Sequence, residues 1–457
     1  MGASTLAQVK EKEKNKMSRD LDTKRTITSP NGLGRTGSAG NWKPMQFLTV
    51  AFLLMATLPP AWGEAKPRAD LSRLVVVGDS LSAGFQNGGL LDIQQVNGYA
   101  SLVANQAHTT LPLPLILTPG IPNVLTLVSP GPPPVIAPLP GTSLGRRNPL
   151  EQAMDLAVPG ANVQDALTTR PAFTFNNITD FVLGQPGVYT GTSRSQVEWA
   201  ENLAPTTLFI WLGNNDALGV IFTGDVSALT PLPAFEAAYT TVTSRLAATG
   251  AAMVLANIPD VTVIPYLTSA EKVALLAGQP LDVLGPVLGL SRGDFVTPDA
   301  FPLILARLAN PALGKLPGNV VLDKSEVEII RDRIEGYNHV IAKQAHENGA
   351  ALVDIHGLLN RIQAKGYVVD HQKLTADFLG GIFSLDGIHP TNTGYAIVGN
   401  EFITELNREF KTDIRDIPLA EIKSGDPLVL QGVEQRPSRA DHVSRETVRE
   451  LRGVILH

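Results

Sequence analysis

The sequence predicts an α/β protein in which helices cover both faces of a five-stranded parallel sheet. Short apolar runs recur along the chain, and segments with helical spacing separate them. Strands that alternate with helices pair in parallel, because each helical crossover returns the chain to the same edge of the sheet. Uninterrupted apolar runs, as opposed to alternating ones, are typical of strands that are buried on both faces. The expected strands are Leu74–Val77, Met154–Ala157, Thr206–Leu212, Ala252–Asn257 and Ala350–Asp354.

The spacing of apolar residues predicts helices between these strands. Tyr99–Gln106 is a short helical segment, and a longer one ends at Gly250. Ser325–Glu328 has the pattern of a capping box, which predicts the start of a long helix. A last helix is expected over Gly394–Phe410.

Composition limits the class of protein. The chain has 457 residues, of which 44% are hydrophobic and 18% are charged, so it can bury a large core. The formal net charge is -6, and no long basic patch is interleaved with aromatic residues, which argues against nucleic acid as a partner. The chain has no cysteine, which excludes disulfides, thiolate metal sites, a cysteine nucleophile and cysteine lipidation.

The N-terminal part differs from the rest of the chain. Residues 1–44 are polar with a run of mixed charges, so we expect a disordered extension. Residues 45–63 resemble a secretory signal peptide, because the apolar stretch Phe47–Leu58 is followed by two prolines and small residues at a cleavage spacing. Translation that starts at Met17 or Met45 would place this peptide at the N-terminus. The alternative is an uncleaved anchor helix, although the stretch is short for a membrane span. We therefore expect a secreted or periplasmic protein.

Four polar stretches follow the predicted strands or precede the last helix. They carry a hydroxyl, a backbone amide, a side-chain amide, and a carboxylate with an imidazole. The carboxyl ends of parallel strands share one edge of the sheet, and the loop before the last helix can return to that edge. These groups are the nucleophile, oxyanion donors, orienting acid and base that acyl transfer needs. The stretches are Gly78–Leu81, Asp155–Asn162, Gly213–Asp216 and Asp386–Pro390.

Together the four stretches resemble the motifs of the GDSL, or SGNH, hydrolase family, in the order and spacing of that family. Gly-Asp-Ser-Leu with Ser80 resembles the first block, and Gly160 stands where the second block has its glycine. Gly-Asn-Asn-Asp with Asn215 resembles the third block, and Asp386 with His389 in Asp-x-x-His-Pro resembles the last. Asn257–Asp260 also resembles a stretch of the larger lipase-like members.

The resemblance implies a three-layer α/β/α, flavodoxin-like fold over 70–410 and the hydrolysis of carboxylic esters, lipid esters among them. Ser80 would be the nucleophile, His389 the base and Asp386 the residue that orients it. The amides of Ser80 and Gly160 and the side chain of Asn215 would receive the oxyanion. No cofactor and no metal ion is implied. The partner would be a small-molecule or lipid ester, and a lipid substrate would entail transient contact with a membrane or lipid surface.

One position departs from the family pattern. The second block usually has an asparagine five residues before its glycine, and this chain has Asp155 there. The departure puts the geometry of that loop in question. The backbone amide of Gly160 needs no particular side chain and is less affected.

Two insertions and a tail are expected in addition to the scaffold. The insertions lie near 108–149 and 266–322, and a polar tail spans 411–457. Within the first insertion, Leu111–Gly141 is apolar and rich in proline, which excludes a regular helix. This segment is either a lid or wall of an acyl pocket, or an extended loop packed on the core.

Other functions remain as alternatives. Asp79 and Ser80 are common helix caps, so their stretch alone does not distinguish a cap from a nucleophile. Gly141–Gly145 matches the Gly-x-Ser-x-Gly elbow of other hydrolases, but a proline-rich loop precedes it where that motif needs a strand. A two-metal phosphoesterase would need an Asp-x-His segment before Gly78, and there is none. A sugar acetyl esterase, or a lipid- or carbohydrate-binding protein without activity, would use the same scaffold.

Overall fold

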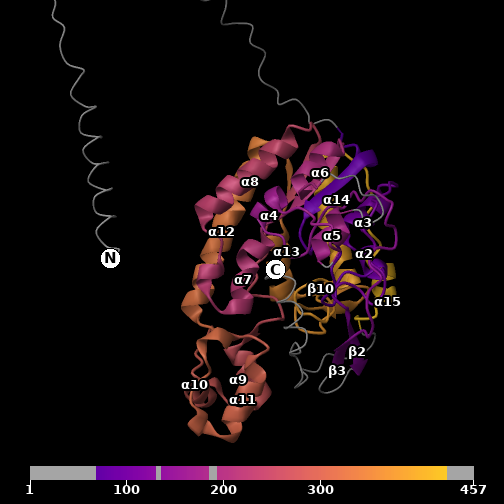
Figure 1. Cartoon of the computed structure of the whole chain (residues 1–457). Coiled ribbons are helices and arrows are strands. Elements are labelled where there is room, and N and C mark those ends of the chain that lie inside the picture. Colours follow the sequence, from indigo (N-terminus) through magenta and orange to yellow (C-terminus); the bar gives the residue numbers. More distant parts are fainter. Residues whose placement is uncertain (1–67, 130–134, 176, 185–192, 430–457) are drawn as a thin grey trace, which may run out of the picture. The chain divides into compact units, whose positions relative to one another are not determined.

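A parallel four-stranded sheet forms the centre of the computed structural model, which describes residues 68–129, 135–175, 177–184 and 193–429 (Figure 1). The expected extension 1–44 and signal peptide 45–63 lie outside the described residues. Val76 pairs with Phe209, Phe209 with Val254, and Val254 with Ala351. All strands run in the same direction, so their carboxyl ends lie at one edge. In sheet order the strands are β1 (Leu74–Gly78), β4 (Thr207–Trp211), β5 (Ala252–Ala256) and β9 (Ala351–Val353).

The prediction of a fifth strand at Met154–Ala157 is wrong, although the segment lies beside β1, where that strand would be. Asp155 forms a single parallel bridge with Val76 of β1. The ladder stops on one side because the Met154 amide donates to the carbonyl of Pro112 (2.8 Å). It stops on the other side because the Gly78 amide donates to the side chain of Gln196 (3.0 Å). The order of the segments is still that of flavodoxin-like sheets.

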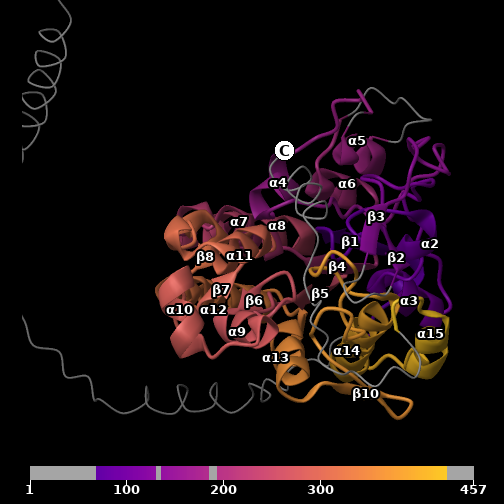
Figure 2. The ribbon, with the colours of Figure 1, turned by 90° about the horizontal axis from the view of Figure 1, so that it is seen from below.

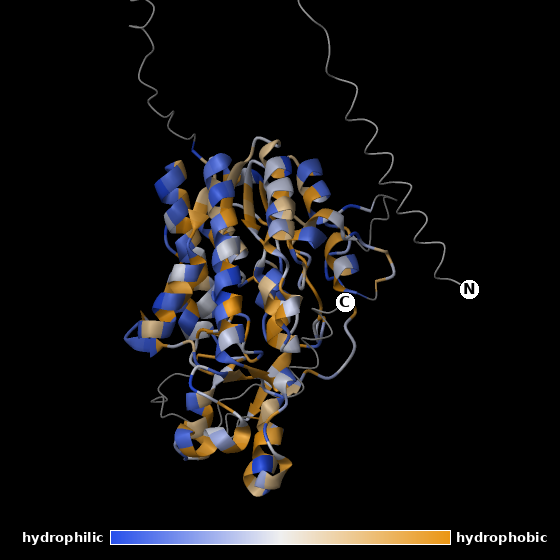
Figure 3. Cartoon of the chain, turned by 90° about the vertical axis from the view of Figure 1, so that its left-hand side faces the viewer, coloured by the Kyte–Doolittle hydropathy of each residue, from blue (hydrophilic) through white to orange (hydrophobic). Residues whose placement is uncertain are grey.

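Helices cover both faces of the sheet, so the predicted three layers are confirmed (Figures 1 and 2). On one face, Tyr99 and Phe402 pack their rings against each other (4.4 Å) and against Phe209 and Trp211 of β4. The outer helices combine polar and apolar residues, as expected when one side of a helix is buried (Figure 3). One layer contains α3 (Tyr99–Gln106) and α14 (Asn392–Phe410), and the other contains α4 (Val163–Thr168), α6 (Gln196–Asn202), α8 (Leu232–Ala247) and α12 (Lys324–Glu347).

The long helix α12 begins two residues earlier than its expected capping box. Asp323 is the N-cap, and its side chain accepts from the amides of Ser325 and Glu326. The Glu326 side chain accepts in turn from the Asp323 amide, so the box is formed by Asp323 and Glu326. Along the described stretches, no helix combines the length and the apolar character that crossing a membrane requires.

The first insertion contains an antiparallel hairpin of β2 (Leu125–Ser129) and β3 (Val135–Pro138). Leu125 is buried in a cluster with Leu385 and Leu428. Its amide donates to the carbonyl of Asn87 (2.7 Å), which lies after the nucleophile stretch. The hairpin is therefore packed on the core next to the expected site. Two short helices, α2 (Asp92–Gln95) and α5 (Ile178–Leu183), also belong to this half of the chain.

The second insertion is a small subdomain with its own apolar core, which includes Val273, Leu288 and Ile304. The Tyr266 amide at its start donates to the carbonyl of Gly387 (3.0 Å), in the loop that carries His389. The subdomain consists of β6 (Thr268–Ser269), α9 (Ala270–Ala277), α10 (Leu281–Leu288), β7 (Phe295–Val296), α11 (Ala300–Ala309) and β8 (Val321–Leu322). Next along the scaffold are α13 (Ile355–Lys365), β10 (Tyr367–Val369) and β11 (Gln372–Leu374).

The segment expected as a polar tail from residue 411 instead packs on the fold as far as Val429. Helix α15 (Leu419–Gly425) contacts α14. Buried Asp426 accepts from the amide and hydroxyl of Thr393 (2.8 Å each), in the first turn of α14. This carboxylate therefore satisfies an amide at the start of the helix that follows the His389 loop.

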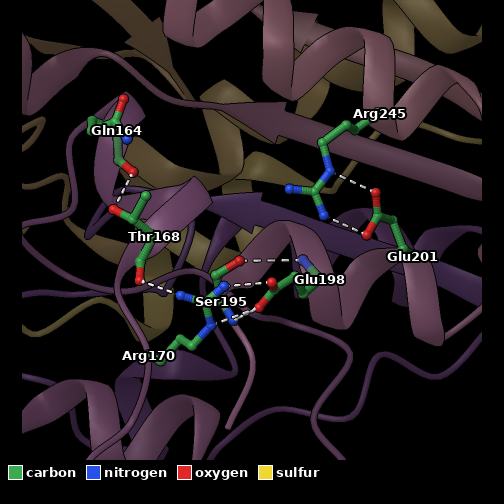
Figure 4. A network of polar contacts seen from close by, with 7 residues as sticks. All are labelled: Gln164, Thr168, Arg170, Ser195, Glu198, Glu201 and Arg245. Atoms are coloured by element: carbon green, nitrogen blue, oxygen red, sulfur yellow. Dashed lines mark hydrogen bonds and ion pairs between the residues drawn. The ribbon is translucent and has the colours of Figure 1, made fainter.

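Helix α6 holds the end of β1 through Gln196, the acceptor for the Gly78 amide. Ser195 and Glu198 form a capping box at its N-terminus, and Glu198 also pairs with Arg170 (2.5 Å) (Figure 4). Arg245 pairs with Glu201 nearby (2.6 Å). These ion pairs are partly exposed and contribute little to stability, so the cap and the packing of α6 fix its position.

Candidate active site

Ser80, His389 and Asp386 meet at the carboxyl edge of the sheet. His389 Nε2 lies 2.8 Å from Ser80 Oγ, and His389 Nδ1 lies 3.0 Å from Asp386 Oδ2. Because a carboxylate only accepts hydrogen bonds, Nδ1 carries the proton and Nε2 can accept from the serine hydroxyl. The ring of Phe85 packs against the imidazole at 4.6 Å. Ser80 and His389 are 309 positions apart in the sequence, and the structure brings them into contact.

The Asp386 carboxylate is fully buried and is held by four donors. Oδ1 accepts from the amides of Ile388 and His389 (2.8 Å each), and Oδ2 accepts from the Gly88 amide (2.8 Å) and from His389 Nδ1. Burial alone would raise the pKa of Asp386, but the charge of His389 and the hydrogen bonds from His389 and Ile388 hold it below its usual value. Asp386 is therefore a carboxylate that stays ionised although it is buried.

Ser80 lies on a series of turns directly after β1, so Asp79 and Ser80 do not cap a regular helix. The amides of Ser82 and Ala83 both donate to the carbonyl of Asp79 (3.1 and 3.0 Å). A Cβ at Gly78 would lie 2.3 Å from the Ser82 hydroxyl, so a glycine is needed for this close turn. Ser80 is 8% exposed, which leaves its hydroxyl at the surface of an otherwise buried cluster.

Gly160 and Asn215 lie next to each other in the structure, as the resemblance implies. The Asn215 side-chain amide donates to the carbonyl of Ala161 (2.9 Å), the residue after Gly160. Gly160 has φ +84, a backbone conformation that favours glycine. Within the described part of the chain, the amides of Ser80 and Gly160 donate to no protein acceptor. They are therefore free to bind an oxyanion.

Asn214 and Asp79 contact each other beside Ser80, although the motif pattern predicts no role for either residue. The Asn214 side-chain amide donates to Asp79 Oδ2 (2.8 Å), and Asp79 Oδ1 accepts from the Leu81 amide (3.0 Å). The pair thus connects the start of α7 (Asn214–Thr223) to the turn that carries Ser80. Burial raises the pKa of Asp79 to about 6, against the hydrogen bonds from Asn214 and Leu81. A second asparagine in the Gly-Asn-Asn-Asp stretch is the signal that could have indicated this contact.

Two more buried carboxyl groups flank the site. Asp216 Oδ2 accepts from the Val163 amide (3.0 Å), which joins the third motif to the loop after Gly160. Burial raises the pKa of Asp216 to about 6 despite hydrogen bonds from Thr230 and Val163. Asp155, at the position where the family usually has asparagine, accepts from the Ala157 amide (3.0 Å). Burial raises the pKa of Asp155 to about 8, so this residue is a neutral acid over most of the physiological range.

An apolar cavity of about 60 Å³ lies between the turn after β1, the His389 loop and helices α13 and α14, and neither Ser80 nor His389 lines it. Leu81 follows Ser80 in the chain, and Ile388 and Pro390 flank His389; all three line the cavity. Pro259, from the Asn257–Asp260 stretch, also lines it, so this stretch forms a wall and not part of the polar cluster. The remaining wall includes side chains of α13 and α14, among them Leu359, Ile362 and Ile397.

The other motifs are not part of this site. Ser143 of the Gly141–Gly145 match lies in a loop, where its hydroxyl donates to the carbonyl of Leu117 (3.1 Å). Strand β3 ends at Pro138, so Leu139 and Pro140 separate it from the motif, and no helix follows directly; the nucleophile elbow is therefore not formed. Among the described residues, no group of three or more His, Asp or Glu side chains is placed to hold a metal ion.

Ser80, His389 and Asp386 thus form a series of hydrogen-bonding contacts on a three-layer α/β/α fold. A profile of the GDSL-like lipase/acylhydrolase family matches residues 74–402, and the chain belongs to this family of hydrolases that act on ester bonds. Among curated proteins, none matches the chain.

Several solved structures resemble the chain at low identity. LAE5, an alpha/beta hydrolase enzyme from the metagenome of Lake Arreo in Spain, is 15% identical, with a TM-score of 0.33 over 74% of this chain and 96% of that chain. The psychrotrophic esterase EstA from Pseudoalteromonas sp. is 11% identical, with a TM-score of 0.33 over 75% and 100%. An acetyl xylan esterase from Geobacillus stearothermophilus is 13% identical, with a TM-score of 0.33 over 75% and 97%. At these scores the family assignment depends on the profile match alone.

Replacing Asp155 by asparagine should remove a pH-dependent loss of stability. The folded chain holds the Asp155 proton up to about pH 8, whereas an unfolded chain releases it near 3.8. The unfolded state therefore gains stability as pH rises between these values, by at most about 1.4 kcal/mol per pH unit. The free energy of unfolding of Asp155→Asn, measured with urea at pH 4 to 8, should exceed that of the wild type increasingly towards pH 8. Asp282→Asn, on an exposed position, is the control, and a difference that does not change with pH would contradict the burial of a neutral Asp155.

Proposed function

We propose that the protein is a serine ester hydrolase that works through an acyl-enzyme on carboxylic esters. The observation that carries this proposal is the series of hydrogen-bonding contacts from Ser80 Oγ to His389 and on to Asp386. A binding protein without activity would not need a serine hydroxyl, an imidazole and an ionised carboxylate in this order. The geometry therefore favours catalysis over binding alone.

In the first half of the reaction, His389 Nε2 takes the proton from Ser80 as Oγ attacks the acyl carbonyl carbon. The buried Asp386 carboxylate stabilises the imidazolium that forms. The amides of Ser80 and Gly160 and the side-chain amide of Asn215 bind the oxygen that becomes negative. When the C–O bond to the alcohol breaks, His389 gives the proton to the leaving oxygen. In the second half, His389 takes a proton from water, which attacks the acyl-enzyme; the bond between the acyl carbon and Ser80 Oγ then breaks, His389 returns the proton to Oγ, and the carboxylic acid is released.

The apolar cavity supports a substrate whose acyl group is a hydrocarbon chain. Leu81 and Ile388, the sequence neighbours of Ser80 and His389, line the cavity, and apolar surface favours burial of apolar groups. A sugar acetyl ester is the second candidate, because an acetyl group is the shortest acyl chain that this cavity accepts. Export through the signal peptide at 45–63 remains a prediction.

A fluorophosphonate probe should label Ser80, and aryl esters should be hydrolysed without added metal. The reason is that the His389 contact makes the Ser80 hydroxyl nucleophilic. Labelling is measured by mass spectrometry of peptides from the wild type and from Ser80→Ala, with hydrolysis assayed with and without EDTA. Ser143→Ala, at the unused motif, is the matched control and should keep both labelling and activity. Labelling that persists in Ser80→Ala, or activity abolished by EDTA, would refute the proposal.

Asn215 should act mainly in the transition state, because the oxygen that it binds becomes charged only there. Asn215→Ala should lower kcat by about 10²–10³ and change KM little. Asn215→Asp should be at least as harmful, since a carboxylate repels the oxyanion. The same purified variants are compared for kcat, KM and Tm. An Asn215→Ala protein with a lower Tm but a nearly normal kcat would show that the amide only holds Ala161.

The acyl chain length that the enzyme prefers should depend on the size of the apolar cavity, because we propose that the cavity holds the acyl group. A series of nitrophenyl esters from acetyl to palmitoyl gives the chain length at which kcat/KM is highest. Leu359→Ala enlarges the cavity and should move the optimum towards longer chains. Leu246→Ala, a buried leucine of α8 that is not part of the cavity wall, is the control and should leave the optimum unchanged. An optimum that stays the same in Leu359→Ala would place the acyl group elsewhere.

A further inference from the structure

A tight turn after the nucleophile contacts the loop that carries Asp386 and His389. Gln86 and Gly89 exchange backbone hydrogen bonds (3.1 Å each), so Asn87 and Gly88 are the two central residues of the turn. Their φ values are +54 and +78, as a type I′ turn requires, and Asn-Gly is the pair that such turns prefer. The turn lies seven residues after Ser80, and its conformation follows from the local sequence.

The tip of this turn binds three consecutive residues of the other loop. The Asn87 amide donates to the Ser384 hydroxyl (3.0 Å), and Asn87 Oδ1 accepts from the Leu385 amide (3.0 Å). The Gly88 amide donates to Asp386 Oδ2 (2.8 Å), the same oxygen that faces His389 Nδ1. These contacts are buried, so a lost partner would leave a polar group without a hydrogen bond.

Two neighbouring contacts strengthen the connection between the two segments. The Gln86 side chain donates to Asn392 Oδ1 (2.8 Å), and the Tyr395 hydroxyl donates to the carbonyl of Phe85 (2.8 Å). Asn392, the acceptor, and Tyr395, the donor, both belong to the first turn of α14. The segment after Ser80 therefore holds the chain both before His389, at Ser384–Asp386, and after it, at the start of α14.

We propose that Asn87 is a positioning residue for the proposed reaction: its side-chain carbonyl fixes the Leu385 amide and thereby sets the Asp386 carboxylate against His389. The residue touches neither substrate nor the reacting atoms. It acts through Asp386, whose Oδ2 must accept from Gly88 and from His389 at the same time. The inference rests on the proposed function, because orienting the imidazole matters only if His389 is the base.

The alternative is that Asn87 serves only to form the turn, and the two roles predict different effects for glycine. Glycine adopts φ +54 readily, so Asn87→Gly keeps the turn while it removes the Oδ1 acceptor. A residue needed only for the turn would therefore be replaced by glycine without loss of activity. A positioning residue would not.

The experiment compares Asn87→Gly with Asn123→Gly, a matched control. Asn123 lies in the first insertion and donates two side-chain hydrogen bonds, to the carbonyls of Leu139 and Gly141 (2.8 and 2.9 Å). Asn87→Gly should lower kcat by about 10- to 100-fold with KM nearly unchanged, the order of loss that a misplaced catalytic group gives. Asn123→Gly should change only Tm.

A second measurement follows the hydrogen bond itself in the free enzyme. The proton between His389 Nδ1 and Asp386 gives a far-downfield proton NMR signal when it is held and shielded from exchange. We expect this signal in the wild type and in Asn123→Gly, and a broadened or lost signal in Asn87→Gly. Ser384→Ala, which removes the acceptor for the Asn87 amide, should change the signal in the same direction and covers the case in which Asn87→Gly does not fold.

The outcomes separate the inference from the proposed function. A wild type that hydrolyses no ester and is not labelled at Ser80 would refute the proposed function, whatever the NMR signal shows. An active wild type with normal kcat and an unchanged signal in Asn87→Gly would overturn the positioning role and leave Asn87 as a turn residue.

Discussion

The site depends on the burial of one charged group, the carboxylate of Asp386. A buried carboxylate is costly unless donors replace the water that it loses. Four donors do so here, and they come from the Gly88 amide on one segment and from Ile388 and His389 on another. Because one oxygen is shared by Gly88 and His389, the turn after Ser80 and the imidazole of His389 cannot move independently. The same bonds that stabilise the charge thus set the distance between His389 and Ser80.

The parts outside the common scaffold are packed around this loop. Leu385, next to Asp386, forms an apolar cluster with Leu125 of the first insertion and Leu428 of the C-terminal segment. The second insertion binds the carbonyl of Gly387 through Tyr266, and Asp426 caps the start of α14. Each contact removes freedom from a loop that has little regular structure of its own. The insertions therefore have a physical connection to the site that their sequences do not show.

Local patterns predicted most of the scaffold, and long-range contacts account for what they missed. Four of the five expected strands are present, because continuous apolar runs report burial on both faces. Met154–Ala157 has the same apolar character, but its ladder is interrupted by Pro112 and Gln196, which lie far away in the sequence. The sequence pattern places the N-cap of α12 at Ser325, two residues after the observed N-cap Asp323, because serine and aspartate are both good N-caps.

The same distinction applies to the site. Ser80, Gly160, Asn215, Asp386 and His389 carry motif spacing, and the structure brings them together as two neighbouring groups. Asn87 lies outside the motifs, and Asn214 lies inside the third motif, which assigns a role only to Asn215. The Asn87 side chain binds a backbone amide 298 positions later, and Asn214 binds a side chain 135 positions earlier. Contacts of this kind follow from the assembled fold, and no periodicity or composition in one segment indicates them.

The four buried acids around the site show why environment, and not residue type, assigns the orienting role. Burial raises the pKa of Asp155 to about 8 and those of Asp79 and Asp216 to about 6, because each has too few donors to offset desolvation. Asp386 is equally buried, yet its pKa is held below the usual value by His389 and by backbone amides. Near neutral pH, Asp386 is therefore the one of the four whose charge is most strongly stabilised, and it is the one that contacts the imidazole. Neutral Asp155 adds no buried negative charge to the segment that leads to Gly160, so an aspartate at the family's asparagine position is compatible with the proposed acyl transfer.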